Sequence, residues 1–367
     1  MAIFEDLTTM GHEQVVFCHD KTTGLKAIIA VHDTTLGPAL GGCRMWDYKS
    51  DEEAIRDVLR LSRGMTYKAA VSGLNLGGGK SVIIGDPKKL KSEALFRTFG
   101  RFVESLGGRY ITAEDVNIRV SDIEQVALET RYVSGVTNRA GGSGDPSPVT
   151  AWGVFNGIRA SVQYKLKKED LKGVSVAVQG CGAVGSHLVE YLVNAGARVF
   201  VADIDSEKVR LNVKQFGAEA ASLDDIHKLA VDVYAPCALG GTLDGKTIPE
   251  IRASIIAGAA NNQLLDEAVH GPMIKERGIL YAPDYVINAG GVINVYQELQ
   301  GYDADIAKKK AAGIYDTLLN VFKQADEKGI TTNQASNQIA EKRLNEVRGM
   351  RDLRNTLRNQ NWWSHNQ

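Results

Sequence analysis

A glycine-rich segment between two apolar runs constrains the fold of this chain more than any other feature. Val174 to Gln179 is a compact apolar run, which predicts a strand, and it is followed directly by Gly180-Cys181-Gly182-Ala183-Val184-Gly185. Apolar residues at helical spacing follow, and a second strand is predicted from Arg198 to Ala202. Asp203 ends that strand, 18 positions after the third glycine. A strand, a glycine turn, a helix and a second strand predict an α/β unit with a parallel sheet.

In such a unit each glycine has a separate role. Gly180 permits the tight turn, Gly182 lets the backbone approach a pyrophosphate, and Gly185 lets helix and strand pack closely. The helix N-terminus, with Cys181, Ala183 and Val184, supplies N–H donors to the phosphates. Asp203 would accept hydrogen bonds from ribose hydroxyls and repel a 2'-phosphate, and Ile204 offers no cation to hold one. The segment predicts a doubly wound Rossmann-type domain that binds NAD rather than NADP; the alternative is a glycine turn in an unrelated α/β domain.

Two lysines mark a second candidate site. Lys68 ends the segment Arg63-Gly64-Met65-Thr66-Tyr67-Lys68, and Lys80 stands twelve positions later, directly behind Gly77, Gly78 and Gly79. A capping box at Ser50 and Glu53 predicts a helix that carries Met65 and Lys68, and a strand is predicted from Ser81 to Ile84. Consecutive glycines favour a sharp bend or a close approach of another group. A lysine desolvated there can act as a base, while the alternative is a glycine turn with a solvated lysine.

A predicted strand from Arg109 to Ala113 ends in Glu114-Asp115. Carboxylates at a strand end are often caps or turn formers. The strand follows the Lys68 and Lys80 elements in an alternating strand and helix pattern, so its tip could also reach the same cleft. Asp115 is therefore a second candidate catalytic residue.

The remaining segments outline two domains. Residues 37–42 are turn-dense and predict a loop, and the Gly, Ser and Pro-rich residues 138–149 predict the inter-domain connection. Later strands are predicted at 232–236, 254–257 and 279–282, and helices at 304–328 and 334–347. We expect a substrate-binding α/β domain at 1–147, completed by C-terminal helices within 329–367, and the Rossmann-type domain at 148–328.

Composition excludes several classes of protein. The chain has 43 basic and 44 acidic side chains, a formal net charge of -1, and therefore predicts neither a nucleic-acid surface nor a membrane surface. No secretory signal and no bilayer-spanning apolar stretch is visible. The four cysteines, widely spaced, predict neither a disulfide framework nor a zinc site, and no metal is implied. We expect a cytoplasmic protein.

Several motifs together resemble one family. They are LGPALGGCRM at 36–45, RGMTYK at 63–68, GLNLGGGK at 73–80, YITAEDV at 110–116, GAANNQL at 258–264 and APDYVINAGGVINV at 282–295. The chain resembles the amino acid dehydrogenases of the glutamate, leucine, phenylalanine and valine superfamily, and most closely its leucine branch. The resemblance covers nearly the whole chain.

The resemblance implies roles for matching residues. Lys68 would bind the substrate α-carboxylate beside Gly41 and Met65, Lys80 would be the general base that activates water, and Asp115 would assist proton transfer at the amine. In the second domain Asn262 would position substrate and nicotinamide; although Asn is also a common turn residue, the motif favours this role. Two further residues would contact the dinucleotide, namely Thr150, at its carboxamide, and Ala238.

The substrate side chain would meet an apolar pocket. The glutamate branch places a lysine where this chain has Leu40, and a dry pocket penalises a buried distal carboxylate. We expect Leu40, Ala113, Val292 and Val295 to line a cavity for leucine and its branched relatives. Three positions resemble the aromatic branches instead, so phenylalanine or tryptophan stays an alternative: Cys43, Asn117 and Tyr296.

The implied reaction is the reversible oxidative deamination of an L-amino acid to a 2-keto acid and ammonium. A cationic lysine suits the substrate carboxylate, and a second lysine can take a proton from the attacking water. A hypothesis from another class is a non-catalytic dinucleotide-binding regulatory protein, but such a protein would be free to lose Lys68, Lys80 and Asp115. The resemblance further implies a homo-oligomer, either a dimer or an octamer.

Overall fold

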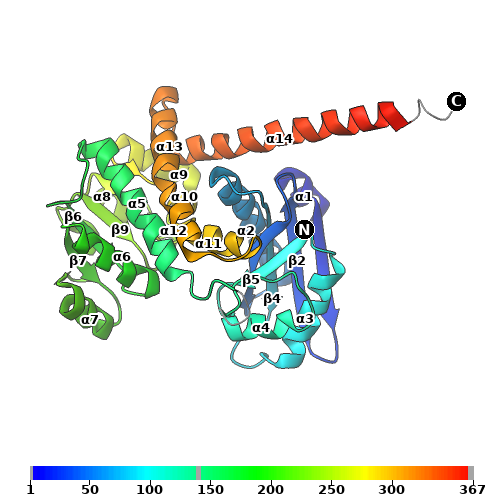
Figure 1. Ribbon diagram of the computed structural model, residues 1–367. Coiled ribbons are helices and arrows are strands. Elements are labelled where there is room, and N and C mark those ends of the chain that lie inside the picture. Colours follow the sequence, from blue (N-terminus) through cyan, green and yellow to red (C-terminus); the bar gives the residue numbers. More distant parts are fainter. Residues whose placement is uncertain (1–2, 138–141, 363–367) are drawn as a thin grey trace. The chain divides into compact units, whose positions relative to one another are not determined.

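The computed structural model describes residues 3–137 and 142–362, with side chains described as far as residue 350. The chain divides into two compact units, whose elements are labelled in Figure 1. Unit 1 comprises residues 1–142 and 338–367, and unit 2 comprises residues 143–337. Both units have the α/β architecture that the alternating pattern predicts.

Unit 1 is built on a five-stranded mixed sheet. The strands are β1 (Gln14–Asp20), β2 (Leu25–Asp33), β3 (Ala39–Trp46), β4 (Gly77–Ile84) and β5 (Tyr110–Glu114), in the order β1-β2-β4-β3-β5. Strand β2 pairs antiparallel with β1 and β4, while β3 pairs parallel with β4 and β5. Helix α1 (Ile3–Met10) precedes the sheet.

Helices cover both faces of this sheet. Helix α2 (Asp51–Val71) packs its Ile55, Val58 and Leu59 against Ile28 and Val82. Its N-cap is Ser50, whose hydroxyl accepts the backbone N–H of Glu53, as the capping box predicts. Helices α3 (Glu93–Ser105) and α4 (Val120–Ala127) pack on the other face, where the apolar side chains of α3 meet the alternate residues of β2.

Two predictions in unit 1 are wrong at the backbone level. The predicted loop at 37–42 ends early, because β3 begins at Ala39. Of the two alternatives for Gly77–Gly79, the sharp bend is wrong, because these glycines are the first part of β4, fully buried. A Cβ on Gly78 would lie 2.1 Å from the backbone nitrogen of Thr66 on α2, and one on Gly79 would lie 2.6 Å from the Tyr110 ring. The glycines serve the close approach of neighbours on both faces rather than a change of direction.

Unit 2 contains a six-stranded parallel sheet. The strands are β6 (Ser175–Gln179), β7 (Arg198–Ala202), β8 (Glu219–Ala220), β9 (Val233–Pro236), β10 (Ile255–Ile256) and β11 (Leu280–Tyr281). Their spatial order is β11-β10-β9-β6-β7-β8, with the first strand in the middle. The chain thus moves outward from β6 to one edge and then returns to build the other half. This is the doubly wound Rossmann order.

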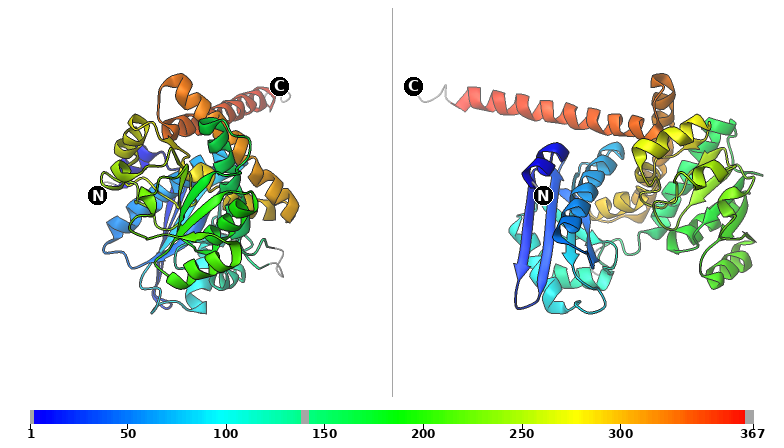
Figure 2. Two further views of the ribbon diagram at one scale, coloured as in Figure 1. Left: turned by 90° about the vertical axis from the view of Figure 1, so that its left-hand side faces the viewer. Right: turned by 180° about the vertical axis from the view of Figure 1, so that it is seen from behind.

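Helices flank this sheet, as the view onto unit 2 in Figure 2 (left) shows. They are α5 (Ser147–Leu166), α6 (Ala183–Asn194), α7 (Ser206–Phe216), the short η2 (Ile226–Lys228), α8 (Thr247–Glu250), α9 (Glu267–Glu276), α10 (Asp284–Ile287), α11 (Gly290–Glu298), α12 (Ala304–Ala312) and α13 (Ile314–Lys328). The single helix predicted at 304–328 is two helices, separated at Gly313. Of the predicted connection at 138–149, residues 138–141 lie outside the described residues, and α5 already begins at Ser147.

Helix α14 (Thr332–Trp362) begins in unit 2 and belongs to unit 1 from residue 338 onward. It is longer than the helix predicted at 334–347. Within unit 1, Arg343 Nη1 donates to the carbonyl oxygens of Ala70 and Leu74 at 3.0 and 2.8 Å, and Arg348 Nη2 lies 2.7 Å from Asp33 Oδ2. These contacts fasten α14 to the end of α2 and to β2. Among the described helices, none combines the length and the apolar character needed to cross a bilayer.

Candidate active site

The centre of the candidate site in unit 1 is an ion pair between Lys80 and Asp115. Lys80 lies on β4 and is 6% exposed, and its Nζ is 2.8 Å from Asp115 Oδ2. Asp115 directly follows β5, so two parallel neighbours of β3 bring these side chains together. A buried charge requires a partner, and each of these two groups supplies it to the other.

The local backbone positions Asp115 closely. A Cβ on Gly42 of β3 would lie 2.7 Å from Asp115 Cβ, so only glycine lets the carboxylate come this near. The residues after it are tied to β3, because Met45 N–H donates to Val116 O at 3.1 Å and Asn117 Nδ2 donates to Met45 O at 3.0 Å. Asn117 has a φ of 60°, a left-handed conformation that Asn tolerates well. Asn117 therefore shapes the turn that presents Asp115, and its side-chain amide is engaged by the hydrogen bond to Met45 O.

Electrostatics keep Asp115 ionised. Burial alone would raise its pKa, but the charges of Lys80 and Arg44 and the hydrogen bonds that they donate lower the pKa below its usual value. Arg44 Nε lies 3.1 Å from Asp115 Oδ2, the oxygen that Lys80 also contacts. The site therefore contains a carboxylate anion held by two cations.

Sequence reasoning missed Arg44 and the residues behind it. Arg44 Nη1 lies 2.9 Å from Asp57 Oδ2 on α2, and Tyr48 Oη donates to the same oxygen at 2.7 Å. The available signal was an arginine within the otherwise uncharged strand ALGGCRMW. Its partners, Asp57 and Asp115, stand 13 and 71 positions away and could not be paired with it from spacing.

The other predicted residues of unit 1 lie on the elements around this pair. Met65 and Lys68 lie half-buried in the last turns of α2, the helix that packs on β4. Leu40, 3% exposed, and Gly41 lie on β3, and Ala113, 7% exposed, lies on β5 in register with Gly42. Gly41 is constrained by packing, because a Cβ there would lie 1.7 Å from Gly79 O.

The glycine turn of unit 2 has two crowded glycines and one open glycine. Gly180 has a φ of 108°, and a Cβ on Gly185 would lie 2.0 Å from Gly180 O, so both are required by the turn and by the packing of α6. Gly182 is the N-cap of α6, and a Cβ there would meet nothing within 4 Å. The described residues therefore leave the space above Gly182 open.

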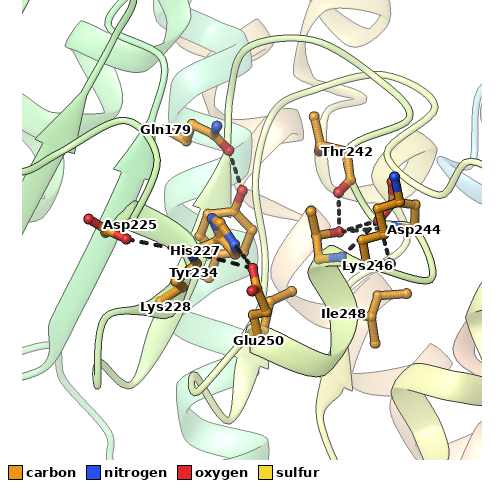
Figure 3. Close-up of polar contacts among 12 residues, drawn as sticks. Gln179, Asp225, His227, Lys228, Tyr234, Thr242, Asp244, Lys246, Ile248 and Glu250 are labelled. Atoms are coloured by element: carbon orange, nitrogen blue, oxygen red, sulfur yellow. Dashed lines mark hydrogen bonds and ion pairs between the residues drawn. The ribbon is translucent and has the colours of Figure 1, made fainter.

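The ends of β6, β7 and β9 surround this turn at one edge of the parallel sheet. Asp203, after β7, accepts the Cys181 N–H at 2.6 Å through Oδ2 and the Asp205 N–H at 2.8 Å through Oδ1. Ile204 and Ala238 are exposed beside it, at the ends of β7 and β9. Figure 3 shows Tyr234 of β9 donating its hydroxyl to Gln179, the last residue of β6, directly before the turn.

Four more predicted residues lie in unit 2. Thr150, on α5, donates its hydroxyl to Pro146 O at 2.9 Å, and Gly290 and Gly291 of α11 approach it closely. Asn262 has a φ of 51° and lies in an exposed turn, whereas Val292 is 8% exposed and Val295 is half-buried on α11. The predicted substrate residues are thus divided, since Leu40, Gly41, Met65, Lys68 and Ala113 belong to unit 1 and Asn262, Val292 and Val295 to unit 2.

A dinucleotide fits the residues of unit 2. The open Gly182 at a helix N-terminus and the acidic Asp203 at the next strand end are the donor and acceptor groups that a pyrophosphate and a ribose need. A metal site is another matter. Within residues 3–137 and 142–350, no group of three or more His, Cys, Asp or Glu side chains could hold an ion.

Comparisons with known proteins agree with this geometry. The family model described as "Glu/Leu/Phe/Val dehydrogenase, dimerisation domain" matches residues 12–132. The model described as "Glutamate/Leucine/Phenylalanine/Valine dehydrogenase" matches residues 141–209 and 200–351. The two matches together span most of the chain.

Individual relatives are similar over almost their whole length. A leucine dehydrogenase of Geobacillus stearothermophilus is 54% identical, with 96% of this chain and 95% of the relative covered. An L-tryptophan dehydrogenase of Nostoc punctiforme is 52% identical, covering 94% and 97%. The crystal structure of L-tryptophan dehydrogenase from Nostoc punctiforme has a TM-score of 0.84 at 50% identity and covers 94% of this chain and 99% of its own. This chain therefore belongs to the family of glutamate, leucine, phenylalanine and valine dehydrogenases, enzymes that use a nicotinamide dinucleotide.

Proposed function

We propose that the protein catalyses the reversible, NAD-dependent oxidative deamination of L-leucine and other branched-chain L-amino acids to 2-keto acids and ammonium. The observation that carries the proposal is the buried pair of Lys80 and Asp115, with Nζ and Oδ2 2.8 Å apart. An amine and a carboxylate in contact can pass a proton between them and to a water or a substrate amine. This is the chemistry that the deamination of an amino acid requires.

Each predicted site residue of unit 1 has a proposed role in the reaction. Lys80 takes a proton from the attacking water, and Asp115, whose pKa is lowered, exchanges a proton at the substrate amine as its nitrogen changes bonding. Lys68, on the helix that packs against β4, binds the α-carboxylate together with Met65 and Gly41. A fixed cation orients the substrate and lowers the cost of bringing its carboxylate out of water.

Unit 2 would hold the dinucleotide. The turn at Gly180, Cys181, Gly182, Ala183, Val184 and Gly185 would bind the pyrophosphate, and Asp203 would bind the ribose and favour NAD over NADP. Ile204, Ala238, Thr150 and Asn262 complete the proposed contacts. When bound, NAD accepts a hydride from the substrate Cα.

The choice of leucine rests on four apolar residues, two in each unit, and on relatives. Leu40, Ala113, Val292 and Val295 are apolar and buried or half-buried, and they offer no partner for a distal carboxylate. A relative named leucine dehydrogenase is 54% identical over nearly the whole chain. An aromatic substrate is the second candidate, since a relative at 52% identity is named L-tryptophan dehydrogenase. Pocket contacts of a methylene or two change specificity by only about 1 to 3 kcal/mol.

We further propose a homo-oligomer that works in the cytoplasm. The family model over residues 12–132 is described as a dimerisation domain. Strand β1, at an edge of the sheet, carries Phe17 with 56% of its surface exposed, and an edge strand of this kind can pair with a second copy.

Three of the four cysteines are buried and all four are free, which suits a reducing compartment.

The test is NADH formation from NAD with a panel of L-amino acids at equal concentration: leucine, valine, isoleucine, phenylalanine, tryptophan and glutamate. A profile led by leucine supports the proposed preference for branched-chain amino acids. A profile led by phenylalanine or tryptophan keeps the mechanism and changes the preferred substrate. If none of the six yields NADH, the proposed activity is wrong, and the hypothesis of a regulatory dinucleotide-binding protein is favoured instead.

A further inference from the structure

Arg44 of unit 1 lies between two carboxylates, one of which belongs to the Lys80 pair. Its Nε is 3.1 Å from Asp115 Oδ2, and its Nη1 is 2.9 Å from Asp57 Oδ2. Lys80 Nζ is 2.8 Å from the same Oδ2 of Asp115. A single carboxylate oxygen is therefore shared by two cations.

This sharing affects how readily Asp115 takes up a proton. Each cation in contact with a carboxylate stabilises its anionic form, so two cations on one oxygen oppose protonation more strongly than one cation does. Because the Lys80 side chain is 7% exposed, solvent screens these effects only weakly. Burial would raise the pKa of Asp115, but the charges of Lys80 and Arg44 hold that pKa below its usual value.

Arg44 is held in place from behind. Its side chain is 20% exposed, and Asp57 on α2, whose side chain is 16% exposed, anchors it. The Tyr48 hydroxyl donates to the same Asp57 oxygen at 2.7 Å, and burial, with help from that hydrogen bond, raises the pKa of Tyr48, so the hydroxyl remains a donor. The guanidinium is consequently fixed on Asp115 by a second carboxylate that does not contact Lys80.

Other titratable and charged groups lie on the elements packed against this site. Burial raises the pKa of the Cys43 thiol on β3 to about 12, so it stays neutral, and burial likewise raises the pKa of Tyr110 on β5. Asp122 on α4 is engaged by Lys91. Two more cations lie on α2, namely Lys68 and the exposed Arg60, which is 3.4 Å from Asp57 Oδ1.

We propose that Arg44 is a positioning residue that holds the Asp115 carboxylate between two cations and thereby keeps it ionised, and competent for proton exchange, at a lower pH than the Lys80 and Asp115 pair alone would allow. The inference rests on the proposed dehydrogenase function. It assigns to Arg44 no contact with substrate or dinucleotide. Its signature is a change in pH dependence, which a purely structural arginine would not produce.

The experiment compares pH profiles of kcat/KM for oxidative deamination of the best amino acid of the panel. In Arg44→Met, we expect the midpoint of the acid limb to move up by about one pH unit, with roughly tenfold lower kcat/KM on the acid side and a plateau within about twofold of the parent. Arg44→Lys restores a cation and should move the limb back toward the parent. Arg60→Met is the matched control, because it removes the same charge from Asp57 without touching Asp115, and its limb should not move.

Thermal unfolding of each variant separates this effect from damage to the fold. If Arg44→Met does not fold, Arg44→Gln, which keeps a hydrogen-bonding side chain without the charge, should show the same upward shift. An equal loss of kcat/KM at every pH, with the acid limb unmoved, would overturn the role of Arg44 while leaving the dehydrogenase function intact. A parent protein without turnover on any amino acid would instead overturn the proposed function.

Discussion

Two glycine-rich segments, Gly77–Gly79 in unit 1 and Gly180–Gly185 in unit 2, look alike in sequence and differ in structure. The first is a buried stretch of strand β4. The second is a turn that leaves strand β6 and starts helix α6. In the first the missing Cβ atoms make room for protein, since Thr66 and the Tyr110 ring occupy the space beside Gly78 and Gly79.

In the second segment the missing side chains do two different things. At Gly180 and Gly185 they make room for the backbone and the packing of the turn, but at Gly182 nothing of the described chain lies within 4 Å of the Cβ position. The comparison teaches that a glycine cluster indicates close approach without saying what approaches. The partner becomes known only from the surrounding elements, and the predictions for Gly78 and Gly182 below separate protein from ligand as the partner.

The largest expected effect separates the proposed catalytic role of unit 1 from the proposed binding role of unit 2. Lys80→Ala should reduce turnover by about a hundredfold to ten-thousandfold, because it removes the proposed base. The dissociation constant for NAD should change little, since the Gly180–Gly185 turn is untouched. Steady-state kinetics and a fluorescence titration with NAD measure the two quantities. Lys89→Ala, at a lysine that is 80% exposed, is the control, and retained activity in Lys80→Ala would remove the base assignment.

The next largest effect concerns stability. In Gly78→Ala the new methyl group would lie 2.1 Å from Thr66 N and 2.5 Å from Ser62 O, so α2 and β4 must separate. We expect the free energy of unfolding to fall by about 3 kcal/mol or more, measured by urea denaturation. Gly64→Ala, on the same helix with nothing within 4 Å of its Cβ, should instead be neutral or stabilise by about 0.5 to 1 kcal/mol. Equal stability of Gly78→Ala and the parent would contradict the close packing of β4.

In unit 2 we expect the opposite pattern, a small effect on stability and a larger effect on NAD binding. Gly182→Ala should lower the free energy of unfolding by no more than about 1 kcal/mol, because alanine is a poorer N-cap than glycine but the added methyl group meets open space. Its NAD affinity should fall by roughly tenfold as the methyl group keeps the pyrophosphate away from the backbone. Calorimetric titration with NAD measures this, and Gly245→Ala, also open at Cβ, is the control. Unchanged NAD affinity would mean that the space at Gly182 serves no ligand.

The smallest effect is a pH dependence of stability that arises beside the buried glycines. His12 and His32 lie edge to face with ring centroids 4.8 Å apart, and His32 Nδ1 is 2.8 Å from the hydroxyl of Thr66, the residue that packs on Gly78. Burial, followed by the neighbouring His32, lowers the pKa of His12 to about 4, and burial also lowers the pKa of His32. The unfolded chain therefore takes up protons at higher pH than the folded chain, so stability is full above about pH 6.5 and declines toward pH 4.

The measurement is urea denaturation at a series of pH values between 7 and 4. We expect a loss on the order of 1 to 3 kcal/mol over that range from these histidines. His12→Gln should flatten the decline, while His187→Gln, at a histidine whose side chain is 38% exposed, should leave it unchanged. The same slope in the parent and in His12→Gln would place the acid sensitivity elsewhere.

The elements of unit 2 could be predicted well from sequence because their signals are local. The strand at β7 was predicted at Arg198–Ala202, as the structure has it, and the turn before α6 was predicted from the residues on either side of it. An apolar run, a glycine pattern and an acidic residue at a fixed distance all lie within about thirty residues of one another. Nothing distant is needed to interpret them.

Unit 1 was harder to predict from sequence because the contacts that decide its structure join residues far apart in the chain. Whether Gly77–Gly79 bend or extend depends on Ser62, Thr66 and Tyr110, which meet the glycines only after the sheet has formed. Arg44 was missed for the same reason, since its two carboxylates come from α2 and from the end of β5. The pairing of Lys80 with Asp115 was anticipated in outline from strand alternation, but the shared oxygen could be seen only in the structure.

Unit 1 is built from two separate parts of the chain, residues 1–142 and 338–367, and this has a consequence for biosynthesis. All of unit 2 is translated before Arg343 and Arg348, the residues that bind Leu74 and Asp33 of unit 1. Domains generally fold as units while the chain is still growing. Unit 2 can therefore fold once residue 337 has been made, whereas unit 1, which carries Lys80, completes its contacts only after α14 has been made.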